Sequence, residues 1–173
     1  MKNLVLVGFM GSGKSTIGPL VAKKMGMRFV DMDSLIEERE KTTISEIFVK
    51  RGESVFREIE TELVKELAIQ QDLVIATGGG VVLRPSNIEI FGRTGILVYL
   101  HVDAQSAFAR TQSYQHRPLL KGKESVKKIG DLLLERASFY DAIPYRVETV
   151  GYSPNKIAET IVDVYRVNAA KST

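Results

Sequence analysis

The sequence contains no cysteine, and it has no long apolar run. Without cysteine the chain cannot form disulfides, bind a metal through thiolates or use a cysteine nucleophile, and its composition fits a reducing compartment. No apolar stretch approaches the ~20 residues of a membrane-spanning helix, and residues 1–7 do not resemble a targeting segment. We therefore expect a cytoplasmic protein that is neither exported nor anchored to a membrane.

A strong excess of one charge is also absent. The formal net charge of +3 comes from 24 basic and 21 acidic residues. This imbalance is too small to predict a nucleic-acid partner, and a site for anionic ligands explains it equally well. The 44% of apolar residues and the total of 173 residues predict one compact domain spanning the chain, 1–173.

Short aliphatic runs alternate with helical patterns along the chain. Strands are predicted at residues 4–7, 28–31, 73–76, 95–100 and 146–150. Helices are predicted at 14–25, 34–40, 44–51, 54–70, 104–110, 126–140 and 155–166, with a kink expected at Pro19. Alternation of this kind predicts an α/β fold: a parallel sheet covered by helices on both faces, a three-layer αβα arrangement that binds ligands at the carboxyl ends of its strands.

Residues 8–15, GFMGSGKS, match the phosphate-binding pattern GxxxxGK[ST] without a gap. They lie between a predicted strand and a predicted helix, which disfavours a chance glycine-rich turn. Backbone amides of the loop and the amino terminus of the helix are expected to surround the phosphates of ATP. Lys14 should reach the β- and γ-phosphates, Ser15 should bind Mg²⁺ through its hydroxyl, and Thr16 should help to bind the α-phosphate. The loop is completed by Gly11, Ser12 and Gly13.

Two groups of charged residues are candidates for binding the phosphate acceptor. Asp31 and Asp33 end a predicted strand, where residues two apart point to the same side, although Asp33 could instead cap the next helix. Arg57 and Glu60 lie three residues apart on a predicted helix. Taken alone, this pair is more typical of a surface ion pair than of a binding site.

Two loops add further candidates. The sequence TGGG at 77–80 follows a buried strand, where glycines let a ligand approach the backbone, although a plain turn is the alternative. The polar, basic segment at about 112–124 is interpreted as a mobile lid. Arg117 in this lid could neutralise charge on the transferring phosphoryl group, or it could be an ordinary exposed arginine.

Together these motifs resemble those of the shikimate kinases in order and spacing over nearly the whole chain. The motifs are GxxGxGKST at 8–16, DxD at 31–33, FRxxE at 56–60, TGGG at 77–80, RPLL at 117–120 and ERxxxY at 135–140. The resemblance implies a five-stranded parallel sheet, as in nucleoside monophosphate kinases. It also implies transfer of a phosphoryl group from ATP to the 3-hydroxyl of shikimate, giving shikimate 3-phosphate and ADP in the pathway to chorismate and aromatic amino acids.

The same resemblance assigns roles at the acceptor site, to which the helices at about 33–62 contribute. Arg57 and Arg136 would bind the carboxylate of shikimate, and Asp33 would be the base for its attacking hydroxyl. Glu60 would orient Arg57. The acceptor site is completed by Gly78, Gly79 and Gly80.

The remaining implied roles concern ATP and its metal ion. Asp31 would lie behind Mg²⁺ through a water molecule. Arg117 would contact ATP when the lid closes, and Arg110 would lie near the adenine. His101 and His116 are interpreted as structural or solvated.

Other functions remain open on sequence grounds. A gluconate-type kinase or a nucleoside monophosphate kinase could use the same scaffold, and a non-catalytic nucleotide-binding switch is a third possibility. A nucleic-acid motor is disfavoured because no extended basic track is visible. The sequence does not determine the oligomeric state, for which a monomer is the working expectation.

Overall fold

A computed structural model describes residues 1–111 and 125–170. Its centre is a sheet of five parallel strands in the order β2-β3-β1-β4-β5. The strands are β1 (Asn3–Val7), β2 (Arg28–Asp31), β3 (Leu73–Ala76), β4 (Gly95–His101) and β5 (Tyr145–Glu148). The predicted α/β fold with a five-stranded parallel sheet is therefore confirmed.

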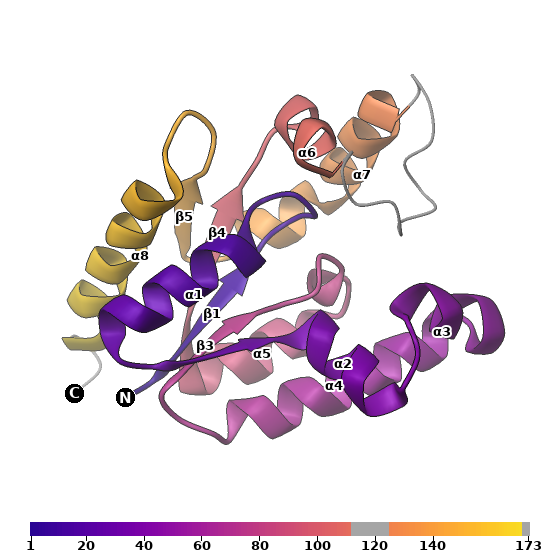
Figure 1. The fold of residues 1–173 in the computed structure, drawn as a ribbon, viewed down its shortest axis with the longest axis horizontal. Helices are drawn as coiled ribbons and strands as arrows, with labels where there is room; N and C mark the ends of the chain where they lie inside the picture. The colour runs from indigo at the N-terminus through magenta and orange to yellow at the C-terminus, as the bar shows by residue number, and fades with distance from the viewer. Residues whose placement is uncertain (112–124, 171–173) are drawn as a thin grey trace.

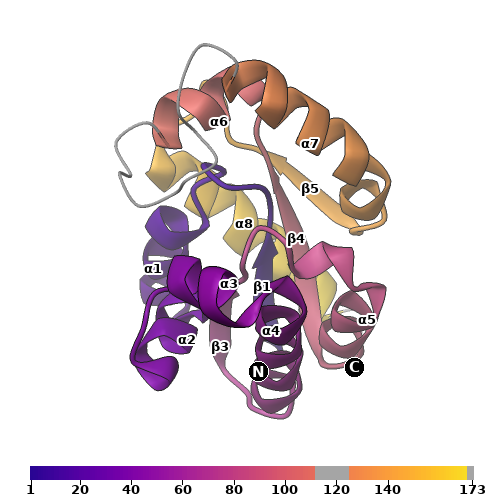
Figure 2. The same cartoon turned by 90° about the vertical axis from the view of Figure 1, so that its right-hand side faces the viewer.

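Helices cover both faces of the sheet (Figures 1 and 2). They are α1 (Lys14–Met25), α2 (Met32–Glu40), α3 (Ile44–Arg51), α4 (Glu53–Ala68), the 3₁₀ helix η1 (Val81–Leu83), α5 (Pro85–Thr94), α6 (Ala104–Thr111), α7 (Ser125–Asp141) and α8 (Pro154–Ala169). Helices α1 and α8 lie side by side on one face, whereas α4 and α5 lie on the other.

The side chains of β1 show why the sheet needs both layers. Leu4 and Leu6 pack into one apolar core with α1 and α8, and Val5 and Val7 pack into a second core with α4, α5 and α7. All four side chains are fully buried. Successive residues of a strand point to opposite faces, so a continuous aliphatic run is what a central strand between two helical layers requires.

The predicted elements agree with the structure to within three residues at each end, but two helices were missed. These are η1 and α5, which follow the TGGG loop. The sequence carried a signal for α5, because Pro85 lies in its first turn, where proline is favoured. In α1 the helix continues through the exposed Pro19 from Lys14 to Met25.

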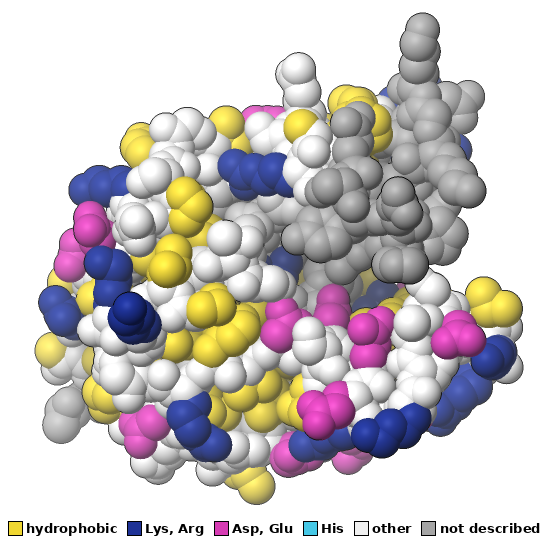
Figure 3. All heavy atoms as spheres, viewed as in Figure 1, with side chains coloured by type: hydrophobic (Ala, Val, Ile, Leu, Met, Phe, Trp, Pro, Cys, Tyr) yellow, Lys and Arg dark blue, Asp and Glu magenta, His cyan; other side chains and the backbone are white. Residues whose placement is uncertain are grey.

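Among the helices of the described residues, none is both long and apolar enough to cross a bilayer. On the face drawn in Figure 3, Lys and Arg side chains gather along the lower right edge and at the left, with Asp and Glu side chains beside them.

Candidate functional site

Three of the segments that carry candidate residues lie where a parallel strand ends. The phosphate loop follows β1, Asp31 is the last residue of β2, and the TGGG loop follows β3. In the sheet, β1 lies next to β3, and β3 lies next to β2. Since carboxyl ends of parallel strands share one edge, the fold brings these three segments together there.

The phosphate loop has a backbone that only glycine accommodates readily. Gly11 and Gly13 have φ values of +75° and +99°, in the left-handed region. At Gly8 a Cβ atom would lie 2.7 Å from the carbonyl oxygen of Leu100 and from the hydroxyl of Ser12. Gly13 is also the N-cap of α1 and offers no side-chain cap to the amides that follow. The amino terminus of α1 is therefore arranged to bind an anion.

Lys14 lies across this loop. Its Nζ atom donates hydrogen bonds to the carbonyl oxygens of Gly8 at 2.7 Å and Phe9 at 3.0 Å. The side chain is largely buried. A cationic group is thus held next to the concave run of amides, where phosphate charge would be neutralised.

Ser15 and Asp31 form a polar pair beside the loop. The hydroxyl of Ser15 donates to Oδ2 of Asp31 at 2.5 Å. The other carboxylate oxygen of Asp31 accepts from the amide of Ser34 at 3.2 Å, so Asp31 is the N-cap of α2. A hydroxyl and a carboxylate are hard oxygen donors of the type that Mg²⁺ prefers, and Mg²⁺ needs few protein ligands.

The position of Asp33 corrects part of the sequence interpretation. Asp33 is neither the cap of the next helix nor part of an extended chain, because α2 already begins at Met32. The premise that Asp31 and Asp33 project from one strand was therefore wrong. Asp33 projects instead from the first turn of α2, and its carboxylate reaches the TGGG loop.

The TGGG loop leaves room for charged side chains on two sides. At Gly78 a Cβ atom would lie 2.8 Å from Oδ1 of Asp33 and 2.9 Å from Oε1 of Glu60. At Gly80 it would lie 2.5 Å from both terminal nitrogens of Arg57. The loop therefore serves as more than a plain turn, because two of its glycines bring α2 and α4 side chains together.

Gly79 connects the same loop to α7. Its carbonyl oxygen accepts hydrogen bonds from Nη1 of Arg136 at 3.3 Å and from the hydroxyl of Tyr140 at 2.9 Å. The guanidinium of Arg136 also lies 5.6 Å from the centre of the Phe9 ring, in the phosphate loop. Arg136 thus lies between the loop after β1 and the loop after β3.

Arg57 and Glu60 form a buried ion pair. Nη1 of Arg57 donates to Oε2 of Glu60 at 3.0 Å, and the two side chains are only 12% and 1% exposed. Burial raises the pKa of Glu60, an effect that the Arg57 guanidinium opposes. The pattern alone favoured an ion pair on the surface, and that interpretation is wrong because both side chains are buried. Each charge needs the other there, since a buried charge without a partner is costly.

Arg110 joins the phosphate loop to the segment after β5. Its guanidinium donates to the carbonyl oxygen of Gly11 at 3.1 Å, and to the hydroxyl and carbonyl oxygens of Thr149 at 3.0 and 2.9 Å. His101 lies near this segment, with Nδ1 at 2.6 Å from Oε2 of Glu148. Arg117 and the proposed lid at 112–124 lie outside the residues that the structure describes.

Sequence reasoning assigned no role to several residues that support the site. Arg84 donates to the backbone carbonyl of Arg57 at 3.0 Å and to the hydroxyl of Thr61 at 3.1 Å. The ring of Tyr140 is buried and stacks on Tyr99 at 4.8 Å. Burial raises the pKa of the Tyr140 hydroxyl, which keeps it a hydrogen-bond donor. Of these supporting residues, only Tyr140 belongs to a motif that the sequence analysis named, as the last residue of ERxxxY.

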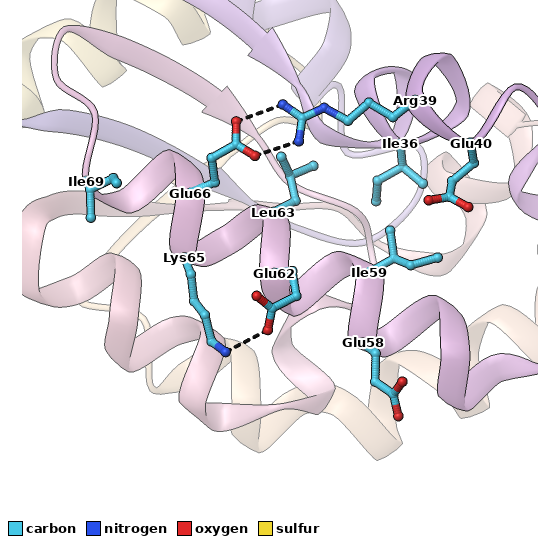
Figure 4. A pocket seen from close by; sticks show the side chains of 10 residues that line it. All are labelled: Ile36, Arg39, Glu40, Glu58, Ile59, Glu62, Leu63, Lys65, Glu66 and Ile69. Carbon is cyan, nitrogen blue, oxygen red and sulfur yellow. Dashed lines mark hydrogen bonds and ion pairs between the residues drawn. The ribbon is translucent and has the colours of Figure 1, made fainter.

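The surface also carries a hollow of about 780 Å³ that belongs to a different region. It lies between α2 and α4, where the guanidinium of Arg39 forms two hydrogen bonds with the Glu66 carboxylate at 2.6 and 2.7 Å (Figure 4). None of the candidate site residues lines it. The candidate site is therefore defined by its convergent polar groups at the strand ends.

Comparison with known families identifies the family of the chain. The family model for shikimate kinase matches residues 10–166. The chain belongs to the shikimate kinase family. A shikimate kinase of Thermodesulfovibrio yellowstonii is 43% identical over 165 residues, which cover 95% of each chain. One from Sulfurihydrogenibium is 41% identical over 94% of this chain and 96% of the relative.

Solved structures agree with this family membership. A shikimate kinase from Acinetobacter baumannii in complex with shikimate has a TM-score of 0.91 and 37% identity, covering 97% of this chain and 94% of that one. One from Bacteroides thetaiotaomicron has a TM-score of 0.85 and 35% identity, covering 99% of both chains. A gluconokinase from Sinorhizobium meliloti, at 15% identity and a TM-score of 0.60, shares the fold alone.

Proposed function

We propose that this chain transfers the γ-phosphoryl group of ATP to the 3-hydroxyl of shikimate, forming shikimate 3-phosphate and ADP. The observation that carries the proposal is the gathering of Asp33, Arg57 and Glu60 around the glycine loop after β3, on the sheet edge that also carries the phosphate loop. Arg136, which bonds to Gly79 of the same loop, adds a second arginine, and two arginines with the Asp33 carboxylate suit a small anionic polyol. The likeness to the Acinetobacter baumannii shikimate complex supports this choice of acceptor.

At the phosphate end, the loop amides and Lys14 would bind the β- and γ-phosphates. The Lys14 ammonium would exchange its bonds to the Gly8 and Phe9 carbonyls for phosphate oxygens. Ser15 would hold Mg²⁺ through its hydroxyl, with Asp31 behind it through water. When bound, this ion would neutralise charge on the β- and γ-phosphate oxygens.

At the acceptor end, Arg57 and Arg136 would bind the carboxylate of shikimate. Hydrogen bonds between charged groups of this kind contribute about 1.5 to 3 kcal/mol each. Glu60 holds Arg57 from the buried side, because it accepts from Nη1. The acceptor would thereby be held in position relative to the γ-phosphate from two helices, by Arg57 of α4 and by Arg136 of α7.

Asp33 is the proposed general base. The oxygen of the 3-hydroxyl would form a bond to the γ-phosphorus while the bond from that phosphorus to the bridging oxygen of ADP breaks, and the hydroxyl proton would pass to Asp33. Such proton transfer contributes roughly 10² to 10⁴ in rate. Lys14 and Arg117 would stabilise the charge on the transferring group, and Arg110 would lie beside the adenine.

A panel of acceptors tests the proposal. Initial rates of ADP formation from Mg-ATP would be measured with shikimate, gluconate and nucleoside monophosphates, and we expect the highest kcat/KM with shikimate. A higher kcat/KM for gluconate or a nucleotide would contradict the acceptor assignment and keep the phosphotransferase assignment. ATP binding without ADP formation from any acceptor would indicate a nucleotide-binding switch.

Two further points remain proposals from the sequence. We propose a cytoplasmic location, where a biosynthetic enzyme would meet ATP. We also propose a monomer, which is the working expectation from the sequence. Light scattering of the purified protein would give the molar mass of one chain, whereas twice that mass would contradict the second point.

A further inference from the structure

Protein groups surround the guanidinium of Arg57 on every edge. Nε and Nη2 donate to Oε1 of Glu53 at 3.3 and 3.0 Å. Nη1 donates to Oε2 of Glu60 at 3.0 Å. The tip of the fork faces Gly80, where a Cβ atom would lie 2.5 Å from Nη1 and Nη2. A carboxylate that pairs with this guanidinium through two hydrogen bonds must therefore displace one of these neighbours.

The three neighbours differ in how readily they can leave. Glu60 is 1% exposed, so removing it from Arg57 would leave a buried carboxylate without its partner. Gly80 is held as backbone between β3 and η1. Glu53 is 60% exposed and is the first residue of α4, so its side chain can turn into water. Only the edge of Arg57 that faces Glu53 can be opened at low cost.

We propose that Glu53 is an internal counter-ion of Arg57 that the carboxylate of the acceptor displaces. This inference rests on the proposed function, in which Arg57 binds that carboxylate. Each binding event then exchanges one ion pair for another, so Glu53 weakens the binding of the acceptor. Glu53 also favours acceptors that carry a carboxylate, because an acceptor without one cannot displace Glu53 from Arg57.

The position of Glu53 also allows a purely structural role. An acidic residue in the first turn stabilises a helix by its interaction with the helix dipole. A carboxylate near the site would in addition repel an anionic acceptor without touching Arg57. The test must therefore separate direct pairing from helix stability and from the general electrostatic field.

Steady-state kinetics of three variants make this separation. Glu53→Gln removes the charge and keeps the length of the side chain. Glu53→Asp keeps the charge and the acidic first turn but shortens the side chain by one methylene group. Glu62→Gln is the matched control, because Glu62 is an exposed residue of the same helix that pairs with Lys65 at 2.7 Å.

We expect Glu53→Gln to lower the KM for shikimate about two- to fivefold, the factor that corresponds to an exposed ion pair. Glu53→Asp should also lower it, because the shorter side chain reaches Arg57 less well. In both variants kcat should change less than KM, and the KM for ATP should stay at the wild-type value. Glu62→Gln should match the wild type, and thermal unfolding of all four proteins would report any loss of stability.

An unchanged or raised KM for shikimate in Glu53→Gln would overturn the inference. So would a wild-type KM in Glu53→Asp beside a lowered one in Glu53→Gln, because the effect would then come from charge at a distance. These failures are distinct from failure of the proposed function. If the proposed function were wrong, the wild-type protein itself would not phosphorylate shikimate.

Discussion

The two ends of the site are built in different ways. The centre of the phosphate end is a single continuous segment, residues 8–16, in which Lys14 bonds to carbonyls five and six residues away. The acceptor end is assembled from α2, α4, α7 and the loop after β3, and its bond from Arg136 to Gly79 joins residues 57 positions apart. Backbone conformation determines the first end, and the packing of helices against the sheet determines the second.

This difference predicts different consequences of mutation. The phosphate end carries the groups that would meet the reacting phosphorus, so changes there should reduce turnover itself. Apart from Asp33, the proposed base, the residues of the acceptor end hold the second substrate, so changes to them should act mainly on the KM for shikimate. The following variants test whether the two ends separate in this way.

The largest effect is expected for Lys14→Ala. Loss of the ammonium leaves the charge of the transferring phosphoryl group uncompensated, and removal of one such group costs at least about 10² to 10³ in kcat. The rate would be followed by ADP formation at saturating substrates, with circular dichroism and thermal unfolding as controls for folding. Near wild-type turnover by a folded variant would refute the role of this lysine.

Arg57→Ala should affect the acceptor far more than ATP. We expect the KM for shikimate to rise about 10- to 100-fold, the loss of one charge-assisted hydrogen bond or slightly more, while the KM for ATP stays within about threefold. Because Ala leaves Glu60 without its buried partner, Arg57→Lys provides a second variant that keeps a positive charge. Equal loss of affinity for both substrates would assign Arg57 to the nucleotide end.

Gly80→Ala tests whether the glycine loop controls the position of Arg57. The backbone of Gly80 has a φ of −105°, which alanine adopts without strain, but the new Cβ would lie 2.5 Å from the guanidinium. The KM for shikimate should rise about tenfold, since a 1 Å misplacement can cost up to ~10²-fold.

Gly92→Ala is the control for this substitution. Gly92 lies in α5, and its Cβ would meet only Leu97 at 3.7 Å, an ordinary contact. Its kinetics should equal those of the wild type. If both glycine variants behave alike, the position of Arg57 does not depend on the loop.

The smallest effect concerns stability and pH. Burial raises the pKa of Glu60 above its ordinary 4.5, so the folded protein holds this proton more tightly than the unfolded chain. The contribution of Glu60 to the free energy of unfolding is therefore greatest below pH 4.5 and falls as pH rises through the raised pKa. Urea unfolding of the wild type and of Glu60→Gln at several pH values measures this contribution as the difference between their free energies of unfolding. A difference that stays constant or grows with pH would contradict the assigned shift.

The same contrast explains what the sequence could predict. The sequence predicted the segment from β1 through the phosphate loop to α1, because its strand, its turn glycines and its helix are contiguous. Positions 33, 57, 79 and 136 have no local pattern that joins them, so their meeting was predicted only through the resemblance to a family. The start of α2 was misplaced because Asp31, rather than a later residue, accepts the capping bond.

Some contacts of the site were in principle readable. Glu53 lies four residues before Arg57 on one helix, a spacing that favours an ion pair, and it was passed over. The bonds from Arg110 to Thr149 were not readable in this way, because they depend on the pairing of β4 with β5.

The most direct test of the central claim is ³¹P NMR of a reaction mixture containing the protein, Mg-ATP and shikimate. We predict a new phosphomonoester resonance that grows in equal amount with ADP, and no such resonance when shikimate is omitted. Release of inorganic phosphate in its place, or intact ATP after prolonged incubation, would contradict the assignment of the two ends to donor and acceptor.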